Sequence, residues 1–138
     1  MQGKLKSGTA SGKTTFTKKL AKHLHIQEKL TIMGMDNFYW GIPENIENPD
    51  DYDFDHPKSL DFDYMYKCLR ELLSQGETMA PQYCFKTHSR KKEKVKLVSK
   101  EVLIFEGILS MHDERIRNLF DLKIFIHCDA DIALARRI

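Results

Sequence analysis

The stretch SGTASGKTT, from Ser7 to Thr15, constrains the fold of this chain more than any other part of the sequence. It nearly matches G-x-x-x-x-G-K-[ST], a pattern in which backbone N–H groups, a lysine and a helix N-terminus surround the phosphates of a nucleotide. We therefore predict a phosphate-binding loop, with Lys13 on the β- and γ-phosphates and the Thr14 hydroxyl on Mg²⁺. The residues expected to bind the nucleotide are Gly8, Thr9, Ala10, Ser11, Gly12, Lys13, Thr14 and Thr15.

Two features in front of the second glycine depart from this pattern. Ser7 stands where the first glycine is usual, and a positive φ at that position would cost about 1 kcal/mol or more. The strand that should precede the loop is weak, because lysines flank Leu5 and only Met1 is apolar besides it. The alternative is a Gly/Ser/Thr-rich turn without function. The full run GTASGKTT favours a working loop whose N-terminal support is compromised or missing.

The composition is that of one ordinary globular domain, which we expect to cover residues 1–138. Apolar residues make up 41% and charged residues 30% of the chain, and the net charge of +2 favours neither nucleic acid nor membrane as a partner. The longest apolar run, VLIF at 102–105, is too short to span a bilayer. Cys68, Cys84 and Cys128 show no disulfide or metal-ligand spacing. We therefore expect a soluble, cytoplasmic protein.

Hydrophobic periodicity predicts alternating strands and helices, and hence an α/β fold. Such a chain forms a parallel sheet with helices on both faces, and its ligands bind beyond the carboxyl ends of the strands. Ser59 is expected to cap the second helix and Gly76 to end it. The predicted helices are 14–25, 59–75, 113–120 and 129–138; the predicted strands are 30–33, 102–105 and 122–128, with a loop over 41–57 and irregular strands around a basic SRKKEK turn over 79–98.

Charge is uneven along the chain. Eight acidic residues lie between Glu44 and Asp63, and seven basic residues lie between Lys86 and Lys100. The plain interpretation is two solvated surface segments. A nucleic-acid surface would need more interleaved aromatic residues and a more basic chain, so we expect no nucleic-acid partner.

Two carboxylates, Asp36 and Glu106, each follow a short apolar strand. In a parallel sheet both would face the edge where the phosphate-binding loop lies. One could accept a proton from an attacking hydroxyl while the other holds Mg²⁺, as phosphoryl transfer requires. A single aspartate after a strand is more often a turn or helix cap. The presence of two, with a phosphate-binding loop, favours chemistry.

Six ordered motifs carry a resemblance to a known family. They are GTASGKTT at 8–15, MDNFY at 35–39, YDFDHPKSLD at 52–61, PQYCFKTHSRK at 81–91, VLIFEGIL at 102–109 and IFIHCDADIALARRI at 124–138. In this order they resemble the uridine–cytidine kinases of the phosphoribulokinase/uridine kinase family, which have P-loop kinase folds. The resemblance implies a small β-hairpin insertion, the cofactors ATP and Mg²⁺, and phosphorylation of uridine or cytidine at the 5′-hydroxyl.

The resemblance also implies a role for each matched position. Asp36 would be the catalytic base beside Lys13, and Glu106 would join Thr14 in serving Mg²⁺. Asp55 would bind the ribose hydroxyls, a role that suits a carboxylate facing a vicinal diol. Tyr39 would line the nucleoside site, Tyr83 and His88 would read the base with Phe85 beside them, and Arg137 would contact the phosphates.

Each of these positions also has a plainer interpretation. Without the motif, His88 would more often be a surface histidine, and Tyr83 and Phe85 would more often be core residues of a strand. Asp55 would more often be a solvated acid. The motif order is what favours the binding roles.

The chain departs from the family at its C-terminal end, because it stops at Ile138 where the family continues into an arginine-bearing lid. Such lids cover the phosphates and exclude water. The alternatives are therefore a catalytically impaired, truncated homologue that binds nucleotide or nucleoside or pairs with another subunit, and a kinase of the same group with another acceptor. Uridine against cytidine, feedback regulation and oligomeric state stay open, although the family tends toward homo-oligomers.

Overall fold

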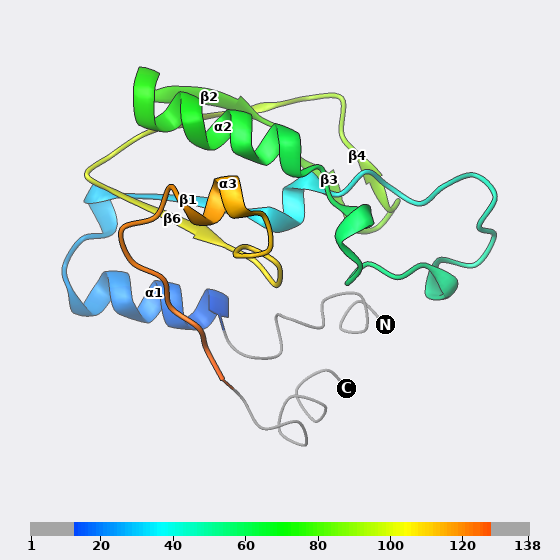
Figure 1. Cartoon of the computed structure of the whole chain (residues 1–138), viewed down its shortest axis with the longest axis horizontal. Coiled ribbons are helices and arrows are strands. Elements are labelled where there is room, and N and C mark those ends of the chain that lie inside the picture. Colours follow the sequence, from blue (N-terminus) through cyan, green and yellow to red (C-terminus); the bar gives the residue numbers. More distant parts are fainter. Residues whose placement is uncertain (1–12, 128–138) are drawn as a thin grey trace.

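The computed structural model describes residues 13–127 (Figure 1). Short 3-10 turns connect the helices and strands, and one of them, Met35–Phe38, follows the first strand directly. The helices are α1 (Lys13–His23), α2 (Phe62–Gln75) and α3 (Glu114–Arg117); the strands are β1 (Leu30–Gly34), β2 (Glu77–Ala80), β3 (Tyr83–Cys84), β4 (Ser89–Arg90), β5 (Val95–Val98) and β6 (Val102–Glu106).

The central element is a parallel pair of strands, β1 and β6, whose register runs from Leu30 opposite Val102 to Gly34 opposite Glu106. Both strands are rich in the β-branched and apolar residues that favour a pleated, half-buried surface. Helix α1 lies on one side of this pair, and α2 and α3 lie on the other (Figure 1). The predicted α/β fold, with parallel strands and helices on both faces, is confirmed.

Helix α2 forms because its apolar side chains recur at helical spacing and bury Met65, Leu69 and Leu72. Gly76 ends it in the left-handed conformation at φ 82°, as predicted. The predicted start at Ser59 is wrong. The Ser59 hydroxyl donates to two carbonyl groups of the preceding loop, and Asp61 caps the helix by accepting from the Tyr64 N–H at 3.0 Å.

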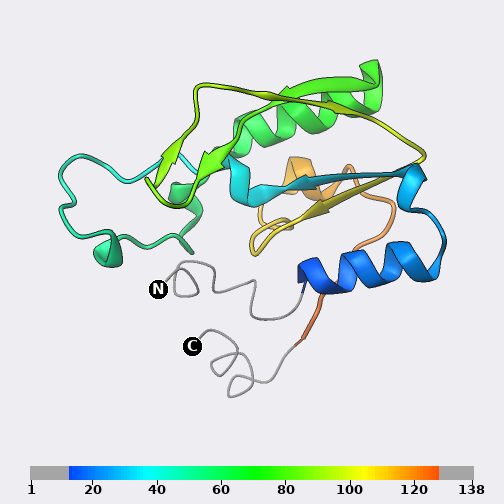
Figure 2. The ribbon, with the colours of Figure 1, turned by 180° about the vertical axis from the view of Figure 1, so that it is seen from behind.

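The insertion between α2 and β6 consists of two antiparallel pairs, β2 with β5 and β3 with β4 (Figure 2). The predicted hairpin is thus present, but its tight turn is residues 85–88 and not the SRKKEK segment. Ser89 and Arg90 of that segment form β4. His88 closes the turn with φ 50°, a left-handed conformation that histidine adopts more often than most residues.

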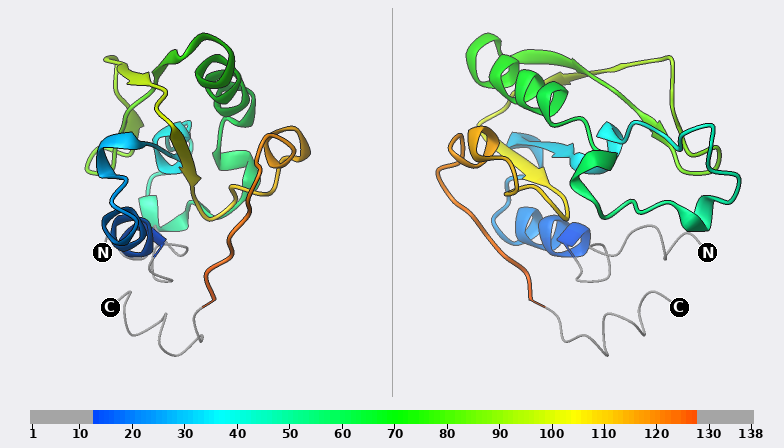
Figure 3. Two further views of the ribbon diagram at one scale, coloured as in Figure 1. Left: turned by 90° about the vertical axis from the view of Figure 1, so that its left-hand side faces the viewer. Right: turned by 45° about the vertical axis from the view of Figure 1, so that its right-hand side comes forward.

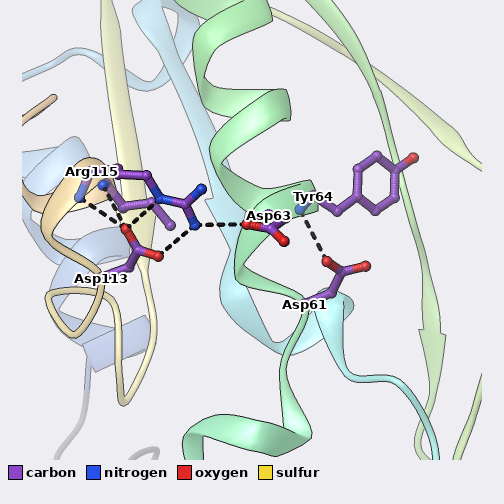
Figure 4. A network of polar contacts seen from close by, with 6 residues as sticks. Asp61, Asp63, Tyr64, Asp113 and Arg115 are labelled. Atoms are coloured by element: carbon purple, nitrogen blue, oxygen red, sulfur yellow. Dashed lines mark hydrogen bonds and ion pairs between the residues drawn. The ribbon is translucent and has the colours of Figure 1, made fainter.

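Helix α3 is shorter than predicted and is fastened to α2 by an ion-pair network (Figure 4). Asp113 caps it, and the Arg115 guanidinium donates to Asp113 and to Asp63 of α2, each at 2.8 Å. The core is formed by buried side chains of β1, the turn after it, α2, α3 and the start of the insertion, and Figure 3 shows how these elements lie together.

The strand predicted at 122–128 does not form over the part that the structure describes. Residues 122–127 pair with no described strand, and Leu122 and Phe125 remain 74% and 83% exposed. The helix predicted at 129–138 lies outside the described residues. None of the helices between residues 13 and 127 has the length and apolar composition needed to cross a bilayer.

Candidate functional site

The carboxyl ends of β1 and β6 form one edge that carries both predicted carboxylates. Glu106 ends β6 opposite Gly34, and Asp36 lies in the 3-10 turn that follows β1. The hydroxyl of Thr17, in α1, donates to a Glu106 carboxylate oxygen at 3.3 Å. The structure therefore brings the start of α1, Glu106 and the Asp36 turn to the same edge (Figure 1).

The predicted phosphate-binding residues are only partly within the described chain. Lys13 and Thr14 open α1, and Thr15 lies exposed in its first turn. The expected nucleotide ligands Gly8, Thr9, Ala10, Ser11 and Gly12, and the expected phosphate ligand Arg137, lie outside the described residues.

Close packing fixes the turn that carries Asp36. A Cβ added to Gly107 would lie 2.3 Å from the Cβ of Met35, which is fully buried. Real carbon atoms do not approach so closely, so the end of β6 lies against Met35 only because residue 107 is glycine. Asp36, the next residue along the chain, is held at the sheet edge by this contact.

Aromatic side chains from three separate segments meet beside this turn, and we call them the aromatic cluster. Tyr39 contacts both Phe54 and Tyr83, with ring centroids 5.4 Å apart in each case. Phe54 also contacts His88 at 5.7 Å, and Tyr83 contacts Phe85 at 5.1 Å. The cluster therefore joins Tyr39, Tyr83, Phe85 and His88, the four side chains that the sequence predicted around a base.

Phe54 is the member of the aromatic cluster that the sequence analysis missed. It is 4% exposed and connects Tyr39 to His88, besides contacting Tyr52 at 4.7 Å. Its signal in the sequence was the YDFD run, in which an aromatic residue directly precedes Asp55.

Two buried polar atoms of the aromatic cluster have no hydrogen-bond partner among residues 13–127: the Tyr83 hydroxyl and the His88 Nδ1 atom. An unpaired buried polar group costs about 1–3 kcal/mol, so a ligand that reached these atoms would remove that cost by supplying a partner. Burial, with smaller contributions from the nearby Tyr52 and Cys84, raises the pKa of Tyr83 to about 12. The Tyr83 hydroxyl is therefore protonated at neutral pH and available as a donor.

The electrostatics of Tyr39 relate the aromatic cluster to the carboxylates. Burial raises the pKa of the Tyr39 hydroxyl, and the negative charges of Asp36 and then Asp55 raise it further. Both carboxylates thus lie within electrostatic reach of one phenol. Asp55 is exposed, and its backbone N–H donates to the Asp53 carboxylate at 3.0 Å. The structure therefore brings the predicted base and the predicted ribose ligand near the same tyrosine.

The sheet edge suits a magnesium ion better than a metal held by protein ligands alone. Residues 13–127 contain no cluster of three or more His, Cys, Asp or Glu side chains that could hold a metal. Mg²⁺ usually binds through one or two carboxylates, phosphate oxygens and water. Glu106 supplies a carboxylate of this kind at the edge where α1 begins. The donor chemistry therefore fits.

Comparison with known proteins gives the same family along nearly the whole chain. Residues 5–138 match the family model "Phosphoribulokinase / Uridine kinase family". The chain is 40% identical over 131 residues to uridine-cytidine kinase A of Dictyostelium discoideum, and 37% identical over 134 residues to a uridine kinase of Brevibacillus brevis. These matches cover 95% of this chain, but the chain spans only 26% of the first relative and 61% of the second.

A solved structure shares the fold. The structure described as a possible uridine kinase from Bacillus stearothermophilus superposes with a TM-score of 0.67 over 92% of this chain and 70% of its own, at 18% sequence identity.

Proposed function

This chain belongs to the phosphoribulokinase/uridine kinase family, and we propose that it transfers the γ-phosphate of ATP to the 5′-hydroxyl of uridine or cytidine. The product would be the nucleoside monophosphate of pyrimidine salvage. The observation that carries the proposal is the aromatic cluster with its two unpaired polar atoms, on Tyr83 and His88, next to the turn that bears Asp36.

Asp36 would act as the base for the acceptor hydroxyl. Its carboxylate accepts a hydrogen bond from the 5′-hydroxyl, orients the oxygen toward the γ-phosphate and takes up the proton as the bond to phosphorus forms and the bond from phosphorus to the β,γ-bridging oxygen breaks, releasing ADP. Glu106 and Thr14 would hold Mg²⁺, and Lys13 would bind the β- and γ-phosphates. Mg²⁺ bound there would neutralise negative charge on the phosphate oxygens.

The aromatic cluster would bind the pyrimidine. Phe54, Phe85 and Tyr39 offer apolar ring surfaces, while the Tyr83 hydroxyl and His88 Nδ1 bind polar groups on the edge of the base. The exposed carboxylate of Asp55 accepts hydrogen bonds from the ribose hydroxyls.

The test of this proposal is uridine-dependent release of ADP from MgATP by the purified chain. We expect release with uridine, none without it, and loss of at least about a hundredfold in kcat with Asp36→Asn. Tyr83→Phe keeps the ring and removes only the hydroxyl, so it should raise the KM for uridine and leave the KM for ATP unchanged. If Asp36→Asn leaves turnover unchanged, Asp36 is not the base.

A second measurement distinguishes catalysis from binding alone. Uridine at a hundred times its Kd should stabilise the folded chain by about 2.7 kcal/mol, which appears as a raised Tm. Stabilisation without ADP release would favour the alternative of an impaired binding or subunit-pairing fragment. If uridine neither stabilises the chain nor causes ADP release, the nucleoside site is refuted.

We also propose a reducing compartment such as the cytoplasm, because Cys68 and Cys84, the two cysteines in the described part of the chain, are free thiols. Homo-oligomer formation, to which the family tends, is best tested by light scattering of the purified chain.

A further inference from the structure

We propose that Asn37 and Arg90 act as positioning residues that hold the hairpin β3–β4 at a fixed distance from the Asp36 turn, so that the site selects an acceptor long enough to reach both. This inference rests on the proposed function. Its structural half, the coupling of the hairpin to the turn, can be tested without any turnover.

Two hydrogen bonds join the Asp36 turn to the hairpin. The Asn37 side-chain oxygen accepts from the Tyr83 N–H at 3.3 Å, and the Phe38 carbonyl accepts from the Arg90 guanidinium at 3.1 Å. Both acceptors lie in the same 3-10 turn as Asp36. Both donors lie on the same rung of the hairpin, because Tyr83 is paired with Arg90. The two bonds therefore fasten one turn to one rung.

Arg90 is itself held from several directions. Its guanidinium donates to the Asp61 carboxylate at 3.4 Å and lies 5.0 Å from the ring centre of Trp40 and 5.8 Å from that of Tyr64. Its side chain is only 24% exposed. A planar guanidinium can donate in two directions while stacking on rings, which a lysine ammonium does not reproduce.

We call the two hydrogen bonds between the Asp36 turn and the hairpin the clamp. The Phe38 carbonyl connects the clamp to α2. It accepts from the Asp61 N–H at 2.9 Å as well as from Arg90. Asp61 also caps α2 through its other carboxylate oxygen. The position of the hairpin is thus fixed relative to the first turn of α2, a helix whose apolar face is buried in the core.

The coupling of the hairpin to the turn matters because one acceptor molecule must contact Asp36 and the hairpin residues at the same time. Asp36 engages the hydroxyl that reacts, while Tyr83 and His88 engage the base. Misplacement of reacting groups by about 1 Å can cost about a hundredfold in rate. A loosened clamp should therefore weaken the use of uridine far more than the use of ATP, which does not contact the hairpin in this proposal.

Three variants test the clamp, with a fourth as control. Asn37→Ala removes one link, Arg90→Met removes the other, and Asn37→Asp keeps an oxygen that can accept from Tyr83. The matched control is Lys96→Met, which breaks an ion pair with Glu77 at 2.8 Å within the same insertion but does not touch the turn.

Amide hydrogen exchange of the free protein tests directly whether the clamp holds the hairpin to the Asp36 turn. We expect the Tyr83 amide to exchange at least about tenfold faster in Asn37→Ala and to recover in Asn37→Asp, because it loses and regains its acceptor. Arg90→Met should raise exchange across residues 83–90, whereas Lys96→Met should not. Unchanged exchange in both clamp variants, or an equal rise in Lys96→Met, would overturn the coupling.

Steady-state kinetics test whether the clamp affects the use of uridine. We expect Arg90→Met and Asn37→Ala to raise the KM for uridine about tenfold or more, with the KM for ATP unchanged and Lys96→Met like wild type. If wild type turns over uridine and neither clamp variant changes its KM, the positioning role is wrong. If wild type shows no uridine-dependent turnover, the proposed function fails, the selection of the acceptor fails with it, and the exchange data alone decide whether the clamp exists.

Discussion

The absence of a Cβ at residue 107 sets the position of Met35 and hence of Asp36. A Gly107→Ala substitution would place a carbon 2.3 Å from the Cβ and 2.8 Å from the Cε of Met35, which is buried and cannot move away. We expect a loss of about 1–3 kcal/mol in the free energy of unfolding, measured with urea, and reduced turnover. Gly34→Ala is the control, because the nearest atom to its added Cβ is 3.9 Å away and its φ of −88° suits alanine. Equal losses in both variants would contradict this account.

Cys84, which has no assigned role, should be the more reactive of the two described cysteines. A hydrogen bond from the Thr87 hydroxyl, helped by backbone N–H groups of the turn, lowers the pKa of the Cys84 thiol to about 7. Burial raises that of Cys68. We expect iodoacetamide to label Cys84 with a rate that rises through neutral pH, as read by peptide mass spectrometry. Thr87→Val should raise the pH at which the labelling rate of Cys84 is half its maximum. If this pH does not change, the Thr87 hydroxyl does not lower the pKa of Cys84.

At the scale of elements, the Asp113 carboxylate caps α3 and holds Arg115, which pairs with Asp63 of α2, and the stabilisation from the Asp113 charge should weaken in acid. Arg115 lowers the pKa of Asp113, chiefly by its hydrogen bond. A lowered folded-state pKa contributes stability above the ordinary value of about 4, and this contribution is lost as the pH falls through the folded-state value. Asp113→Asn keeps a capping oxygen but removes the charge. We therefore expect it to be less stable than wild type at neutral pH, with the difference in unfolding free energy shrinking below about pH 4.

The control for this pH dependence is Asp121→Asn, which changes an exposed carboxylate outside the network. Its stability should follow that of wild type at every pH. A difference for Asp113→Asn that stays constant as the pH falls would mean that the charge of Asp113 does not stabilise α3.

Elements with strong local signals could be predicted from the sequence, and those that depend on partners could not. The periodic apolar face and Gly76 identified α2, but its start was misplaced because Ser59 bonds to loop carbonyls instead of capping the helix. Residues 122–127 have the apolar composition of a strand, yet a strand requires a neighbour on its backbone. Composition carries no information about that neighbour.

In the site, too, residues within sequence motifs could be predicted, and residues that act through distant contacts could not. Ordered motifs identified the aromatic residues and carboxylates that the structure brings together. Phe54 and Arg90 were not predicted to matter, because their contacts join segments that are distant in the sequence. The roles proposed for these aromatic residues and carboxylates, as for Lys13 and Arg137, stay predictions.

At the scale of the whole molecule, residues 122–127 leave apolar surface exposed. Phe125 makes little contact with the core, so Phe125→Ser should change the free energy of unfolding by less than about 0.5 kcal/mol. It should, however, lower the binding of a hydrophobic dye and slow aggregation, because exposed apolar patches promote association. Phe120→Ser is the contrasting variant, since Phe120 stacks on Phe105 at 5.9 Å and its loss should destabilise the fold. Equal dye binding by wild type and Phe125→Ser would contradict this expectation.

The pairing of β1 with β6 also bears on how quickly the site can form. The segment between Leu30 and Val102 includes α2 and the whole insertion. Pairing β1 with β6 must therefore close this long loop before it gains any contact. The hairpin β3–β4 joins near neighbours in the sequence and carries no such entropic cost. Folding rates fall as contacts become less local. The hairpin that carries Tyr83 and His88 can therefore form early, whereas the aromatic cluster and the edge that brings Asp36 and Glu106 together need contacts between distant segments and are completed late.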